Sequence, residues 1–469
     1  MSHKRINKIL LIFVILVMLL ITVQCAPQPT PVAEEPAAEE PAVEEPAAEE
    51  AAPAEEAEPE EPAEAEEPAE ETMMYEGVEL TLASMTDQYI EAFRYLIPKF
   101  KEETGIDITM DELGYVDLYQ KLTADFVGET AQYDLMTMDI VWSGEYAQNG
   151  YTVPLNDFMD KDADVLDLDD ILPVMWTQGE WEGQYWAFPL GGYANVLNYR
   201  KDLFEEAGLE PPKTQEDLLE AAKALNDPDN EVYGIAMLGA GSAGAQDYMV
   251  WVQQHGGTLL DADGNIKVNT PENVETLEFF GSLFEYGPPG ATDYWWDQRE
   301  TAFREGLVAM MEGWSISRND YEDPEMSQVV GQVDLSYAPA AEAVGEPTYG
   351  FGGWGIGINA DSESAKQEAA WEFIKWLSSP EVQKEWVLHR GPPLRTSTMN
   401  DPEIVAELPW MPILLDSFEK GDGDYRPRIP QYTIMQDALG TYVNSFLIGE
   451  MTAQEALDAA QAQIEQNIQ

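Results

Sequence analysis

A regular alternation of short apolar runs and helical patterns between residues 78 and 139 limits the possible folds most. Residues 78–84, 106–110 and 133–139 have the composition and spacing of strands. Between them, residues 87–104 and 119–126 carry apolar side chains at helical spacing, and Gly105 ends the first of these helices. Strand–helix–strand repeats of this length predict an α/β fold with a parallel sheet. In such a sheet, ligands collect at the carboxyl ends of the strands.

A second block of this kind begins at a pair of glycines. Residues 186–199 form an extended apolar segment that is interrupted by Gly191 and Gly192, which can adopt backbone angles that other residues resist. Further strands are expected at 232–237, 307–314, 332–338 and 351–358, and helices continue to residue 468. We interpret the glycine pair as a hinge between two lobes, with a ligand in the gap between them. Replacing Gly192 with Val is then expected to impair closure more than folding.

The N-terminus has the layout of a secretory signal. Three basic residues precede an apolar run over residues 9–23, and Cys25, the only cysteine, follows it directly. Residues 22–25 resemble a bacterial lipoprotein cleavage box, although Thr22 and Gln24 replace its usual leucine and small residue. We expect a signal peptide at 1–25 and lipid attachment through Cys25. A retained N-terminal anchor and simple secretion are the alternatives.

Residues 26–76 are expected to be a disordered tether. Between Ala26 and Glu71 the chain is almost only Ala, Glu and Pro, with eighteen glutamates and no basic residue. After Glu71 there remain 71 acidic and 21 basic residues, a net charge near −50. Nucleic acid and anionic lipid are poor partners for such a surface, whereas neutral ligands are not disfavoured.

Several stretches, in order, carry a resemblance to a known family. They are residues 82–106, 146–150, 187–204, 211–214, 311–315, 352–359, 391–395 and 428–431. In this order and spacing the chain resembles the family 1 extracellular solute-binding proteins of ABC importers, which include binding proteins for maltose and other oligosaccharides.

The resemblance implies a periplasmic-binding-protein type II fold, in which two α/β lobes are joined by a hinge with the ligand cleft between them. Family topology assigns residues 77–192 and 341–391 to one lobe and residues 193–340 and 392–469 to the other. It also implies capture of an extracellular carbohydrate by hinge closure and delivery to a membrane permease. We expect a monomer, tethered as a lipoprotein to the outer face of the bacterial cell membrane.

Aromatic residues are the first candidates for a sugar site, because sugars present hydroxyls around an apolar ring face. Trp314 and Trp354 lie next to glycines at strand or turn positions, where packing in a core is less expected. Trp142 lies in the loop after Asp139, and Trp296 either lines the cleft or fills a lobe. Tyr193 follows the glycine pair and is expected to face the gap.

Polar candidates lie in loops after predicted strands. Asp87 and Asp139 occupy the places where the family has acceptors for sugar hydroxyls, although Asp87 could instead cap the helix that it precedes. Gln88 could bind beside Asp87 or simply be solvated. Arg395 could donate two hydrogen bonds to a ligand or could pair with a surface acid.

No metal or cofactor is expected. His3, His255 and His389 are far apart in sequence and no cysteine accompanies them. The run from Asp261 to Asn265 departs from a calcium loop, because Gly264 is fourth rather than sixth, and a hairpin turn is the better interpretation. The leading hypothesis is a carbohydrate-binding protein and not an enzyme. A binding protein for a cationic or peptide solute and a secreted glycosidase are the alternatives.

Overall fold

The computed structural model describes residues 75–468. The predicted signal peptide, the lipid attachment at Cys25 and the tether up to residue 74 lie outside this range. Among the described residues, no helix combines the length and the apolar character that are needed to cross a bilayer.

The first strands and helices form a parallel sheet, as the sequence predicts. They are β1 (Glu79–Met85), α2 (Ile90–Thr104), β2 (Asp107–Leu113), α3 (Tyr115–Gly128) and β3 (Leu135–Asp139). β1 lies between β2 and β3 and is parallel to both. α2 ends at Gly105, whose φ of 78° lets its N–H donate to the carbonyl of Lys101. The three strands therefore present their carboxyl ends at one edge of the sheet.

Short elements follow β3 before the chain reaches the centre of the molecule. They are η1 (Ile140–Trp142), α4 (Ser143–Asn149), α5 (Asn156–Lys161), α6 (Ala163–Leu166), η2 (Leu168–Asp170), η3 (Pro173–Gln178), β4 (Glu180–Trp181) and β5 (Gln184–Tyr185). Most of them span fewer than two helical turns or only two strand residues. A periodic pattern needs a longer window, so the sequence did not predict them.

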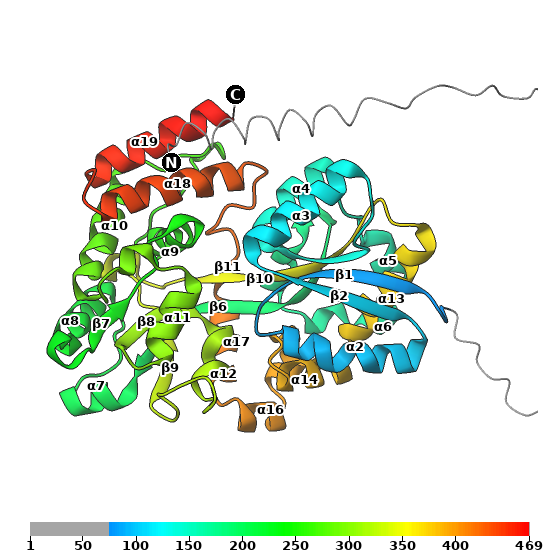
Figure 1. The fold of residues 1–469 in the computed structure, drawn as a ribbon, viewed down its shortest axis with the longest axis horizontal. Helices are drawn as coiled ribbons and strands as arrows, with labels where there is room; N and C mark the ends of the chain where they lie inside the picture. Colours follow the sequence, from blue (N-terminus) through cyan, green and yellow to red (C-terminus); the bar gives the residue numbers. More distant parts are fainter. Residues whose placement is uncertain (1–74, 469) are drawn as a thin grey trace, which may run out of the picture. The chain divides into compact units, whose positions relative to one another are not determined.

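Two long strands, β6 (Phe188–Arg200) and β10 (Tyr349–Ile358), run through the middle of the described residues. They pair antiparallel with each other, and the strand order is β2-β1-β3-β10-β6-β8-β7, with β9 also on β6. Figure 1 shows β6 and β10 side by side, extending from the group around β1–β3 to the group around β7–β9. Nearly every residue of both strands is buried, which fits their continuous apolar sequences.

The second group of elements surrounds β7–β9. Its members are α7 (Lys201–Ala207), α8 (Gln215–Leu225), η4 (Pro228–Asn230), β7 (Tyr233–Ala236), α9 (Gly241–Gln254), α10 (Pro271–Leu283), η5 (Phe284–Tyr286), η6 (Ala291–Asp293), α11 (Trp296–Arg304), β8 (Val308–Trp314), η7 (Ser315–Ser317), α12 (Arg318–Tyr321) and β9 (Val333–Tyr337). β7 is parallel to β8, and α8 and α11 pack on this pair. The hairpin turn expected over Asp261–Asn265 is closed by a single bridge between Leu260 and Ile266.

The C-terminal part is mainly helical, and its helices pack against both the elements around β1–β3 and those around β7–β9. Its elements are η8 (Glu342–Val344), α13 (Ser364–Leu377), α14 (Pro380–Leu388), α15 (Thr396–Met399), α16 (Pro402–Glu407), α17 (Met411–Glu419), β11 (Gly421–Asp422), α18 (Tyr432–Leu447) and α19 (Ala453–Asn467). α14 packs against α2, whereas α18 packs against α9 and α19. Thr452 and Glu455 form a capping box that begins α19. The lobe boundaries expected from the sequence stay a prediction.

Gly191 and Gly192 lie inside β6 and do not separate two strands. The register between β6 and β10 shifts here, so that Leu190 is an extra residue in a β-bulge and Gly191 adopts a φ of 145°. The buried side chain of Gln178 fills the bulge. Its Nε2 donates to Gly191 O at 2.7 Å, and its Oε1 accepts from Leu190 N at 3.1 Å.

Close packing around Gly192 corrects the expected effect of replacing it with Val. A Cβ at this position would lie 2.5 Å from Cε2 of Phe351 and 2.9 Å from Cε of Met175. Both distances are shorter than a Cβ contact tolerates, so the larger residue must displace buried neighbours. The substitution therefore acts on folding before it can act on closure, and the hinge role of the segment stays a prediction.

Candidate ligand-binding site

A cavity of about 910 Å³ lies at the carboxyl ends of β1, β2 and β3. The segments after these strands form one wall, and β8, η7, α12 and the start of α11 form the other. The cavity therefore lies where the sequence analysis expected ligands to collect, at the carboxyl ends of the parallel strands. Its volume lies in the range of roughly 300–1,000 Å³ that is typical of small-molecule sites.

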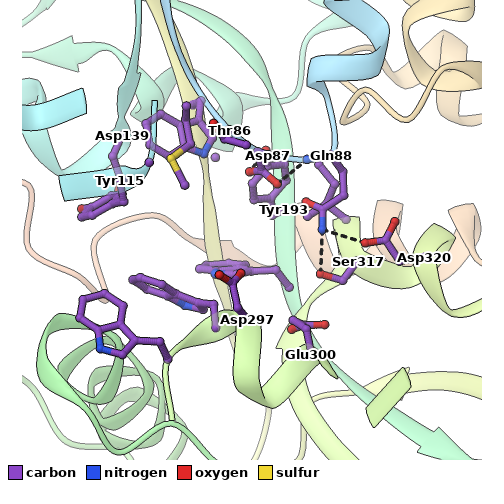
Figure 2. A pocket seen from close by; sticks show the side chains of 18 of the residues that line it. Thr86, Asp87, Gln88, Tyr115, Asp139, Tyr193, Asp297, Glu300, Ser317 and Asp320 are labelled. Atoms are coloured by element: carbon purple, nitrogen blue, oxygen red, sulfur yellow. Dashed lines mark hydrogen bonds between the residues drawn. The ribbon is translucent and has the colours of Figure 1, made fainter. Parts of the chain in front are cut away.

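Asp87 lines the cavity and accepts two hydrogen bonds within the protein. Oδ1 accepts from the backbone N–H of Gln88 at 2.7 Å, and Oδ2 accepts from the hydroxyl of Tyr193 at 3.0 Å (Figure 2). Burial raises the pKa of Asp87 to about 6, although both hydrogen bonds favour the ionised form. Asp87 does not cap α2, because Tyr89 is the N-cap residue and no side chain bonds there.

Gln88 crosses the cavity. Its Nε2 donates to Oδ2 of Asp320 at 3.2 Å and to Oγ of Ser317 at 3.4 Å, two residues of the opposite wall (Figure 2). Gln88 is thus not simply solvated. It connects the segment after β1 with η7 and α12.

Asp139 and Arg426 form a buried ion pair on the cavity wall. The guanidinium Nη1 and Nη2 atoms each lie 3.4 Å from an oxygen of the carboxylate, and Nη1 is also 3.4 Å from Oε1 of Gln246. The hydroxyl of Tyr115 donates to Asp139 Oδ2 at 3.0 Å. These contacts to Arg426 are long for charge-assisted hydrogen bonds, so the guanidinium keeps capacity to bind a further acceptor.

Aromatic rings hold Arg426 in place and flank the pair. Its guanidinium carbon lies 5.6 Å from the ring centres of both Trp314 and Tyr425. Although burial acts to lower the pKa of Arg426, the Asp139 carboxylate raises it well above its ordinary value. The arginine is therefore charged under all working conditions.

Six aromatic residues line the cavity: Tyr115, Tyr193, Trp295, Trp296, Trp314 and Trp354. The ring of Tyr115 lies 5.9 Å from that of Trp296 and 6.1 Å from that of Trp354. Seven of the nine candidates from the sequence thus lie in the lining, namely Asp87, Gln88, Asp139, Tyr193, Trp296, Trp314 and Trp354. Their contact with a ligand stays a proposal.

Trp142 lies outside the cavity lining. It is 1% exposed, and its ring packs 5.3 Å from Tyr115 and 5.7 Å from Trp354. Its place in a loop after β3 suggested access to the ligand, but η1 turns the side chain into the core. Trp142 therefore supports two lining aromatic residues from behind.

Arg395 is also remote from the cavity lining, and the structure does not support a ligand contact. The side chain is fully buried, and its nitrogens donate to the carbonyls of Leu166 at 2.6 Å, Asp167 at 3.0 Å and Ser378 at 2.6 Å. A further contact of 3.4 Å joins it to Asp170. All three of its nitrogens are used in joining chain segments.

Sequence reasoning missed several lining residues, above all Arg426 and Arg390. Arg426 lies only two residues before the stretch 428–431 that carried the family resemblance. Its position between Tyr425 and Pro427 in a strongly acidic segment was the available signal, since an isolated arginine beside an aromatic residue favours stacking.

The lining combines charged acceptors, charged donors and aromatic faces. Carboxylates accept hydrogen bonds from hydroxyls, arginine donates to them, and rings pack on C–H surface. Within residues 75–468, no group of three His, Cys, Asp or Glu side chains is placed to hold a metal ion. The arrangement is suited to recognise a small ligand with many hydroxyls.

The family model of the bacterial extracellular solute-binding proteins matches residues 86–384. The chain belongs to this family. The match includes most of the cavity lining, from Thr86 to Trp354, whereas Arg390 and Arg426 lie beyond its end. Solute binding outside the cytoplasm, and not catalysis, characterises the family.

Individual members support the assignment of this solute-binding protein. A mannitol-binding protein of Pseudomonas aeruginosa is 28% identical over 83% of this chain and 93% of its own. A solute-binding protein of Agrobacterium radiobacter K84, solved with ribitol, is 47% identical with a TM-score of 0.81, covering 84% of this chain and 99% of that one. A solute-binding protein from Agrobacterium vitis S4, solved with D-mannitol, is 28% identical with a TM-score of 0.74. The match covers 83% of this chain and 98% of that one. The expected periplasmic-binding-protein type II fold is confirmed.

Proposed function

We propose that this solute-binding protein captures a small, neutral, polyhydroxylated solute, and that acyclic sugar alcohols are its preferred class. The observation that carries the proposal is the buried pair of Asp139 and Arg426, which offers an acceptor and a donor beside each other on an aromatic wall. Adjacent hydroxyls of a polyol can bind both at once. Asp87 and Tyr193 supply a second polar point on the cavity.

Relatives narrow the ligand class. The neighbour at 47% identity was solved with ribitol and another with D-mannitol, while an erythritol/L-threitol-binding protein of Mycolicibacterium smegmatis is 24% identical over 66% of this chain. A maltose-bound protein is also similar, at 25% identity. These names favour linear polyols, with oligosaccharides as the second candidate.

In the cell, the bound solute is delivered to the permease of an ABC importer. A protein with a lipid attached at Cys25 stays near that permease on the outer face of the membrane, and the acidic segment up to residue 74 spans the distance. A mass spectrum of the mature protein tests this part of the proposal. We expect a mass that starts at a diacylated Cys25, and a mass starting at Met1 or Ala26 would contradict the anchor.

A thermal-shift panel with ribitol, D-mannitol, maltose, maltotriose, spermidine and a dipeptide tests the ligand class. A ligand at 100 times its Kd stabilises the folded state by about 2.7 kcal/mol. We expect ribitol or mannitol to raise the unfolding temperature most. Seven acidic and two arginine side chains line the cavity, so stabilisation by spermidine alone would establish the cationic alternative. Release of reducing ends from maltotriose would indicate a glycosidase.

A further inference from the structure

Arg390 and Asp320 connect the two walls of the cavity by an ion pair. Nη1 of Arg390 lies 2.8 Å from Oδ1 of Asp320, and Nη2 lies 2.7 Å from Oδ2 of Asp323. Arg390 follows α14, whereas Asp320 lies in α12 and Asp323 just after it. Arg390 is 70 and 67 positions from the two aspartates in sequence and belongs to a different group of elements.

Asp320 also accepts a hydrogen bond from Gln88, which lies on the first wall. Oδ2 of Asp320 accepts from Gln88 Nε2 at 3.2 Å, while Oδ1 is used by Arg390. Both carboxylate oxygens are thus occupied, Oδ2 by Gln88 of the opposite wall (Figure 2) and Oδ1 by Arg390. The Asp320 side chain is 9% exposed, so removal of its partners would leave a nearly buried charge unpaired.

The backbone around Arg390 is shaped for this contact. Arg390 adopts a φ of 75°, a left-handed conformation that is uncommon for residues other than glycine. The preceding His389 stacks on Tyr95 of α2 with ring centres 3.6 Å apart, which anchors this end of α14 to the first wall. The backbone that carries Arg390 is therefore held in place by the contact between His389 and Tyr95.

We infer that Arg390, Asp320 and Gln88 form a clasp that holds the cavity closed and controls how fast a bound solute leaves. The inference rests on the proposed solute binding for its kinetic part. These are positioning residues: the clasp joins the walls through its own contacts, and its energy is independent of which polyol is inside. Because these contacts favour the closed form, the apparent affinity for every ligand rises with the fraction of the protein that is closed.

The test compares Arg390→Ala, Arg390→Lys, Asp320→Asn and the Arg390→Ala/Asp320→Asn double variant with the unchanged protein. Lys101→Ala is the control, because Lys101 pairs with Asp107 on an exposed surface and neither residue lines the cavity. Tryptophan fluorescence in stopped flow gives association and release rates for ribitol and D-mannitol. Small-angle scattering without ligand gives the radius of gyration, and thermal unfolding verifies that each variant folds.

We expect Arg390→Ala to release both polyols about tenfold faster, with a similar factor for each, while association changes less than threefold. Arg390→Lys should release the polyols more slowly than Arg390→Ala does. The double variant should release them no faster than either single variant. The ligand-free Arg390→Ala protein should be more expanded, and Lys101→Ala should match the unchanged protein.

Unchanged release rates with an unchanged radius of gyration in Arg390→Ala and Asp320→Asn would overturn the clasp. A loss confined to one polyol would also overturn it, because it would mean that Arg390 binds that ligand directly. If the unchanged protein binds no polyol, the proposed function fails, but the scattering comparison without ligand still tests the clasp. If Arg390→Ala does not fold, Asp320→Asn and Arg390→Lys carry the comparison.

Discussion

Two carboxylates in the cavity differ in their surroundings, and this difference separates their roles. Asp139 faces the guanidinium of Arg426, so its charge is balanced inside the protein. Asp87 has only neutral donors, the Tyr193 hydroxyl and a backbone N–H, and the nearby acids Asp320 and Glu300 add to the effect of burial. Burial therefore brings the pKa of Asp87 to about 6, so that its ionisation changes just below neutral pH.

Asp87 should make solute binding depend on pH. Burial raises the pKa of Asp87 to about 6, so the carboxylate is an acceptor above that pH and becomes protonated below it. If a solute hydroxyl donates to the ionised form, affinity for ribitol should fall below pH 6, by at most about tenfold per pH unit. Calorimetric titration between pH 5 and pH 8 measures this, and Asp87→Asn should flatten the curve. Equal affinity of the unchanged protein at pH 5 and pH 8 would contradict the prediction.

Strand β8 carries an unusual buried acid, Glu312, outside the cavity lining. It hydrogen-bonds to Gln254, its Oε2 has no partner, and burial raises its pKa to about 8. The protonated form is therefore favoured in the folded protein at neutral pH. The strand holds Glu312 in this position because it pairs with Leu197 of β6.

Replacing Glu312 with Gln should stabilise the protein at high pH. The folded-state pKa of about 8 exceeds the ordinary value of 4.5, so the folded state binds more protons between these values and its stability falls as pH rises through this window. The Glu312→Gln variant does not lose stability in this way. The free energy of unfolding of the variant minus that of the unchanged protein should therefore grow from pH 4.5 to pH 8, to a few kcal/mol at most. Denaturant titrations at several pH values measure it, and a constant difference would refute it.

The bulge in β6 should resist substitution more than a flexible hinge would. In Gly192→Val the side chain meets Phe351 and Met175, and overpacking of this kind costs about 1–3 kcal/mol. We expect a lower midpoint of urea unfolding than for the unchanged protein. Unchanged stability combined with altered release of ribitol would instead favour the original interpretation of Gly192 as a hinge residue.

The sequence predicted the regular elements well, because their signals are local. Apolar periodicity and a glycine stop locate α2, and continuous apolar runs locate β6 and β10. The site was only partly predictable. Trp142 and Arg395 have polar or loop-like sequence surroundings, yet tertiary packing turns both inward. Arg426 and Gln178 gain their roles from partners more than 10 residues away, which a local pattern cannot reveal.

At the scale of the whole molecule, charge should select against anionic solutes. The full chain has 89 acidic and 24 basic residues, and the cavity lining repeats this imbalance with seven acids and two arginines. Both arginines already pair with carboxylates, Arg426 with Asp139 and Arg390 with Asp320. A neutral polyol therefore meets hydrogen-bonding groups, whereas an anion meets a negative potential that no free cation in the lining offsets.

Ribonate provides a direct comparison, because it differs from ribitol by a carboxylate in place of one terminal hydroxymethyl group. We expect ribonate to bind at least tenfold more weakly than ribitol at low ionic strength. Raising the salt concentration screens the repulsion, so the difference should shrink while the affinity for ribitol changes less. Calorimetric titrations of both compounds at 20 mM and 300 mM salt measure it. Equal or tighter binding of ribonate would mean that Arg426 or Arg390 leaves its carboxylate to bind the ligand, and that neutral polyols are not the preferred class.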